Sequence, residues 1–63
     1  MSDMEYTHQS VRDYIAAKKR GDRKATDRIV AEASARFNTR KTDGSEMAQL
    51  GHASMHVRFG EDL

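Results

Sequence analysis

A helix-stop signal followed at once by a helix-start signal divides this chain after its first third. Gly21 follows a run of three cations, residues 18–20, and directly precedes Asp22. Cations in the last turn of a helix interact favourably with the negative end of its dipole, and glycine readily adopts the left-handed conformation that ends a helix. Asp is a preferred N-cap, so a second helix can begin immediately. The sequence therefore predicts two helices that a very short link makes antiparallel neighbours.

Hydrophobic spacing predicts the extent of these two helices. The first is expected from about residue 3 to residue 20, because Ser2 and Glu5 form a candidate capping box that favours this start over one capped by Thr7. The second is expected to follow Asp22 and to end in the polar run 38–44. The residues expected to face each other across the hairpin are Val11, Tyr14 and Ile15 on the first helix and Ile29, Val30 and Phe37 on the second.

The last third of the chain contains two conflicting patterns of hydrophobic spacing, one helical and one alternating. Met47 and Leu50 fit a short helix capped by Ser45, whereas apolar and polar residues alternate over 55–59. A helix over 45–53 followed by a short extended segment fits both patterns and is preferred to one helix over 45–59. An extended segment at 54–59 would offer an unpaired edge to another chain. The expected fold is mostly α, a helical hairpin with a short C-terminal helix and a short extended segment, in a single domain over residues 1–63.

The predicted core is poor for an independent fold. The chain has 63 residues and 15 large apolar side chains, and its other hydrophobic residues are eight alanines. Domains of this size usually need a disulfide, a metal or self-association. Because the sequence contains no cysteine, disulfides and thiolate zinc sites are excluded. A homo-oligomer, most simply a homodimer, is therefore expected.

Charge is unevenly distributed along the chain, although the formal net charge is only +1. Residues 18–41 hold nine cations and three acids, residues 1–17 hold one cation and three acids, and residues 42–63 hold one cation and four acids. Such segregation either steers an anionic partner toward the helical turn or is satisfied internally, by an acidic tail that folds back on a basic hairpin. The sequence leaves both interpretations open.

The basic turn at residues 18–28 is the strongest candidate for a binding site. Cations at the end of the first helix interact favourably with its dipole. Arg23 and Lys24, however, lie in the first turn of the second helix, where the dipole makes positive charge unfavourable. We therefore expect a partner to use them, preferably a larger protein with an acidic surface. The alternative is nucleic acid with its phosphates on these cations, although no aromatic platform lies within the basic run.

A candidate apolar patch lies in the C-terminal third. Met47, Leu50, Met55 and Phe59 would form it if this segment packs loosely, and methionine adapts well to irregular contacts. Together the basic hairpin and this patch predict a non-enzymatic regulatory, adaptor or inhibitor protein. The residues predicted to bind the partner are Lys18, Lys19, Arg20, Arg23, Lys24, Arg28, Met47 and Phe59.

No catalytic, metal or cofactor site is predicted. The chain has no cysteine nucleophile and no glycine-rich phosphate loop. His52 and His56 would share one face of a helix, but no further ligands follow at a recognisable spacing, so they are interpreted as surface histidines.

The sequence also lacks any run of about 18 apolar residues, and residues 1–10 have neither the basic nor the apolar part of a signal peptide. A cytoplasmic protein without a membrane partner is expected.

Overall fold

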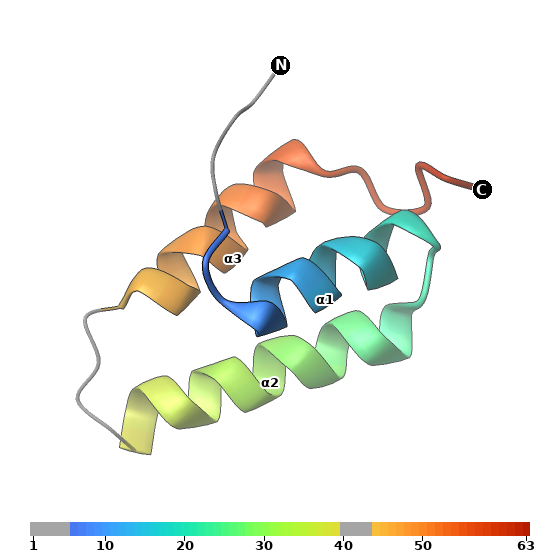
Figure 1. Ribbon diagram of the computed structural model, residues 1–63. Helices are drawn as coiled ribbons and strands as arrows, with labels where there is room; N and C mark the ends of the chain where they lie inside the picture. The colour runs from blue at the N-terminus through green and yellow to red at the C-terminus, as the bar shows by residue number, and fades with distance from the viewer. Residues whose placement is uncertain (1–5, 40–43) are drawn as a thin grey trace.

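Three helices make up most of the fold in the computed structural model, which describes residues 6–39 and 44–63. They are α1 (Gln9–Lys19), α2 (Arg23–Thr39) and α3 (Ser45–His56), and each contacts the other two. Within these described ranges there is no strand. The prediction of a mostly α fold with a helical hairpin and a short C-terminal helix is confirmed (Figure 1).

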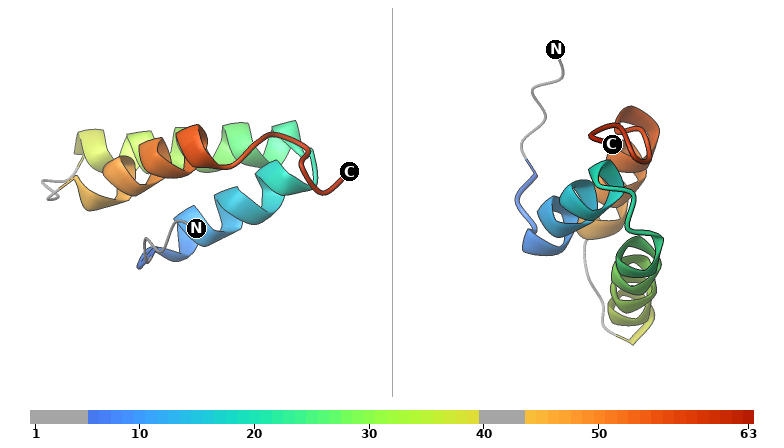
Figure 2. Two further views of the ribbon diagram at one scale, coloured as in Figure 1. Left: turned by 90° about the horizontal axis from the view of Figure 1, so that it is seen from above. Right: turned by 90° about the vertical axis from the view of Figure 1, so that its right-hand side faces the viewer.

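The turn between α1 and α2 forms as its sequence predicts. Gly21 has a φ of 76°, and the Asp22 N–H donates back to the Ala17 carbonyl at 2.9 Å. Asp22 then caps α2, because its Oδ1 accepts the Ala25 N–H at 3.1 Å. The helices diverge from this turn, so that α1 is inclined to α2 (Figure 2).

The predicted start of α1 is wrong. The helix begins at Gln9, its N-cap His8 makes no side-chain capping bond, and residues 6–8 are not helical. The polar groups of Thr7 are directed to α3 instead. Its N–H donates to Gln49 Oε1 at 3.1 Å, and its hydroxyl accepts from Gln49 Nε2 at 3.0 Å. Ser2 and Glu5, the expected capping box, lie outside the described residues.

The core lies where the three helices meet. Its buried members are Val11 and Tyr14 of α1, Ile29 and Ala33 of α2, and Leu50 and Ala53 of α3, with Ile15 and Met47 packed against them.

The expectation that Phe37 also faces α1 is wrong, whereas Val30, although partly exposed, lines a hollow together with Tyr14 of α1. Val30 is 38% exposed and Phe37 is 47% exposed. α2 is longer than α1 and extends past its first turn (Figure 1), so Phe37 lies beside Gly44 and not over α1.

α3 ends between the two predicted limits. It passes residue 53, because Gly51 does not interrupt it, and stops at His56, where Val57 adopts an extended conformation with φ −110° and ψ 125°. Gly44, not Ser45, precedes the first turn as N-cap. The expected strand at 54–59 does not form, because the chain turns after Val57 and returns to the end of α1. The edge that this strand would have offered to another chain is therefore absent.

Candidate binding surface

The basic turn lies at one end of the molecule, where α1 ends and α2 begins (Figure 1). The C-terminal tail, residues 57–63, covers part of it. The Gly60 N–H donates to the Lys18 carbonyl at 2.7 Å, and the Asp62 N–H donates to the Lys19 carbonyl at 2.9 Å. The second bond satisfies a carbonyl at the end of α1 that has no helical partner, and the first adds to the bond that the Lys18 carbonyl already accepts from the Gly21 N–H at 3.1 Å. The tail is therefore a cap for α1, built from main-chain contacts that charge patterning does not predict.

The two lysines of α1 have their side chains engaged within the molecule. Lys18 Nζ donates to the Ser54 carbonyl at 2.7 Å and lies 5.7 Å from the centre of the Tyr14 ring. Lys19 Nζ lies 3.9 Å from a Glu61 carboxylate oxygen, a long and half-exposed ion pair. The interpretation of an acidic tail folded back on a basic hairpin therefore holds for Lys19, whereas the Lys18 ammonium contacts a carbonyl of α3 and an aromatic ring of α1.

Arg20 and Arg23 also have partners at the turn. Arg20 lies 3.3 Å from Asp22, whose pKa is lowered mainly by the capping bond from the Ala25 N–H and further by the contact with Arg20. The Arg23 guanidinium lies 5.2 Å from the centre of the Phe59 ring, a cation–π contact with the tail. Arg23 is nevertheless exposed and forms no ion pair with a carboxylate among the described residues.

Lys24 and Arg28 carry positive charge that no direct contact neutralises. Both side chains are exposed, and neither makes a hydrogen bond or ion pair within the described part of the chain. Lys24 lies in the first turn of α2, where the helix dipole disfavours a cation. The tail therefore leaves Arg23, Lys24 and Arg28 available to another molecule.

The two apolar residues predicted to join this surface lie apart. Phe59 is 46% exposed and lies beside Arg23 in the tail. Met47 is in the first turn of α3, packs against the core, and lines a hollow of about 220 Å³ with Val30. Leu50 is buried, and Met55 is 83% exposed. Of the four residues expected to form one patch, Phe59 is the one that contacts the basic turn.

α1 and α2 leave an open groove of about 720 Å³ between them. Its floor consists of small or buried side chains, Ala17, Ala25 and Ile29. The exposed residues along its two walls are Gln9, Asp13, Ala16 and Arg20 on α1 and Arg28, Glu32 and Arg36 on α2. Sequence motifs do not indicate this groove, because it depends on the angle between the helices.

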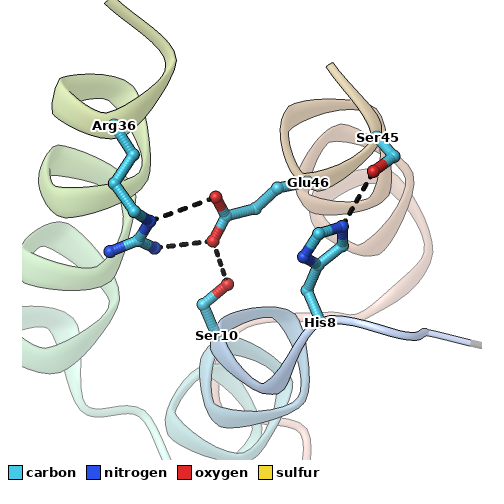
Figure 3. Close-up of polar contacts among 5 residues, drawn as sticks. All are labelled: His8, Ser10, Arg36, Ser45 and Glu46. Carbon is cyan, nitrogen blue, oxygen red and sulfur yellow. Dashed lines mark hydrogen bonds and ion pairs between the residues drawn. The ribbon is translucent and has the colours of Figure 1, made fainter. Parts of the chain in front are cut away.

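A polar network joins the three helices at the end opposite the basic turn (Figure 3). Glu46 of α3 accepts from Arg36 of α2, at 3.3 Å from Nε and 2.6 Å from Nη2, and from the Ser10 hydroxyl of α1. The Arg36 hydrogen bond, assisted by Ser10, lowers the pKa of Glu46, and the same contact raises the pKa of Arg36. His8 Nε2 and Ser45 Oγ, 2.8 Å apart, add a second link between α1 and α3. The opposite charges flanking the predicted loop were the available sequence signal for the Arg36–Glu46 pair.

His52 and His56 do share one face of α3. Their rings stack with centroids 4.2 Å apart, and His52 Nδ1 lies 2.7 Å from the Tyr6 hydroxyl. In the described residues no group of three or more His, Cys, Asp or Glu side chains is arranged to hold a metal ion.

Comparison with known proteins gives no relative: no family model, no curated protein and no solved structure matches this chain. Among the described helices, none combines the length and apolar character needed to cross a membrane.

Proposed function

We propose that this protein is a non-enzymatic regulator, adaptor or inhibitor that binds an acidic surface of a larger protein through its basic turn. The observation that carries the proposal is the exposure of Arg23, Lys24 and Arg28 without an ion pair in the described structure. Positive charge at the start of α2 is unfavourable for the isolated chain. A carboxylate from a partner would remove that penalty.

The surroundings of these cations favour a protein partner over nucleic acid. Phe59 supplies half-exposed aromatic surface beside Arg23, and aromatic residues and Arg are enriched in the centres of protein interfaces. Asp22, Glu61 and Asp62 alternate with the cations of the turn, and their charges would repel a continuous phosphate backbone. A protein surface with a few acidic residues can contact the cations without placing its own carboxylates beside these three.

The proposed mode of action is occlusion or scaffolding. A rigid helical end that covers an acidic patch blocks other molecules from that patch or presents the rest of this protein beside it. The proposal places the protein in the cytoplasm and treats it as a homo-oligomer, with Lys18, Lys19 and Arg20 supporting the turn and Arg23, Lys24, Arg28 and Phe59 making the contact.

The test is affinity capture from host lysate, with and without nuclease treatment, comparing the wild type with Lys24→Glu. Glu is favourable in the first turn of a helix, so this variant keeps its fold. Arg12→Glu is the control for net charge, because it changes that charge equally on an exposed part of α1 away from the turn. It also removes the hydrogen bonds that Arg12 donates to the Tyr6 carbonyl and to Gln9 Oε1, so circular dichroism must show that the control keeps its helices. We expect one protein to be captured stoichiometrically by the wild type and the control, and lost with Lys24→Glu. Capture of nucleic acid, or of the same protein by all three, would reject the proposal.

A further inference from the structure

We propose that the groove between α1 and α2 is the surface on which two copies of this chain pack, with α1 antiparallel to α1 of the second copy. This inference rests on the self-association in the proposed function and is independent of the acidic partner. Lys24, the residue chosen to test that partner, does not line the groove.

The shape of the groove suits a helix. The floor residues Ala17 and Ala25 end at Cβ, and the exposed wall residue Ala16 is equally short. Side chains of this size allow two helix axes to approach to the lower part of the usual range, about 8–10 Å. α3 packs against the hairpin through Leu50 and Ala53, and no described element occupies the groove.

The charges along α1 determine which helix fits. Asp13, Ala16, Ala17 and Arg20 follow the helical spacing of one face and all line the groove. Asp13 lies three residues before Ala16, and Arg20 lies three residues after Ala17. A two-fold axis passing between the alanines therefore sets Asp13 of each copy opposite Arg20 of the other. An isologous interface requires this kind of self-complementarity.

The remaining charges of the groove favour a second copy over a partner of one charge sign. Arg28 and Glu32 on α2 add one charge of each sign. Arg36 and Glu46, at the far end, neutralise each other through their direct hydrogen bonds. An acidic or a basic helix would meet as many like charges as opposite ones here. A second copy, antiparallel in the stated register, meets alternating charges.

Equilibrium sedimentation tests this inference with two charge reversals. Asp13→Arg sets the new arginine of each copy against Arg20 of the other, and Arg20→Asp sets the new aspartate of each copy against Asp13 of the other. We expect the wild type to dimerise and each variant to dimerise about tenfold more weakly or not at all. Mixed in equal amounts, the two variants should form heterodimers, because one chain then carries arginine and the other aspartate at both positions, so that each cross-chain pair joins an arginine to an aspartate. Circular dichroism confirms that each variant keeps its helices.

A steric pair of variants provides a second measurement. Ala16→Glu puts a long acidic side chain at the proposed axis and should give a monomer. Ala31→Glu, at an exposed alanine of α2 outside the groove, should leave the dimer intact.

Three results would overturn the inference: a monomeric wild type, a dimer that tolerates Ala16→Glu, or charge variants that stay monomeric when mixed. A dimer that tolerates Ala16→Glu would point to another face, such as the apolar hollow at Val30 and Met47. The two proposals fail separately. A monomeric wild type that still captures its partner through Lys24 rejects only the groove, and a dimer without a partner rejects only the acidic-surface proposal.

Discussion

Glu46 is the side chain that connects all three helices. It extends from α3 to Arg36 on α2 and to Ser10 on α1, and its side chain is 18% exposed. A hydrogen-bonded carboxylate in this position contributes more to the free energy of unfolding than an exposed surface ion pair, whose median contribution is about 0–1 kcal/mol. The network therefore orients α3 relative to the hairpin.

Glu46→Gln should lower the free energy of unfolding by about 1 kcal/mol at neutral pH, because the amide keeps the shape but loses the charge. Urea denaturation at a fixed protein concentration measures this. Asp27→Asn is the control, since Asp27 is exposed and makes no hydrogen bond or ion pair within the described residues. Equal effects of the two substitutions would show that Glu46 has no special contribution.

The difference in free energy of unfolding between the wild type and Glu46→Gln should depend on pH with a definite sign. The pKa of Glu46 is lowered in the folded protein from its ordinary value of 4.5. A carboxylate with a lowered folded pKa contributes fully above its unfolded pKa, and this contribution is lost as the pH falls through the folded pKa. The gap between wild type and Glu46→Gln should therefore be largest near neutral pH and close below about pH 4. A gap that widens in acid would contradict this assignment.

At the scale of the elements, one glycine ends a helix and another lies inside a helix, so the same substitution should have opposite effects on stability at the two positions. Gly21 ends α1 with φ 76°, and a Cβ there would lie 2.9 Å from Leu63 Cδ1. Gly51 lies inside α3 with open space around the Cβ position. Gly21→Ala should destabilise the fold by about 1 kcal/mol or more, and Gly51→Ala should stabilise it by about 0.5–1 kcal/mol. Thermal unfolding measures both, and effects of the same sign would contradict the described turn or helix.

The same elements indicate what the sequence could predict. The turn at Gly21 and Asp22 was predictable because the hydrogen bonds that end α1 and cap α2 there join residues close in the sequence. The start of α1 was not, because Thr7 bonds to Gln49, a residue distant in the sequence. The unpaired cations of the candidate surface were visible as a charge run, whereas the tail that caps α1 uses main-chain N–H groups, which every residue type except proline carries.

At the scale of the whole molecule, the two proposed surfaces share Arg28, but Lys24 lies outside the groove and Ala16 lies outside the partner contact, so the two surfaces should separate by mutation at these positions. Lys24→Glu should abolish partner capture and leave the sedimentation mass unchanged. Ala16→Glu should give the monomer mass and leave Lys24 exposed for the partner. If both variants lose both properties, the groove and the basic turn belong to one surface and the division is wrong.

The measurement that most directly tests the central claim, a protein partner at the basic turn, is the salt dependence of the equilibrium affinity for the captured molecule. A protein interface centred on Phe59 and Arg23 should lose about tenfold or less in affinity between 50 and 200 mM salt, and Phe59→Ala should weaken it further. A loss of about a thousandfold or more over the same range, unchanged by Phe59→Ala, is the behaviour of cations on phosphates and would contradict the account.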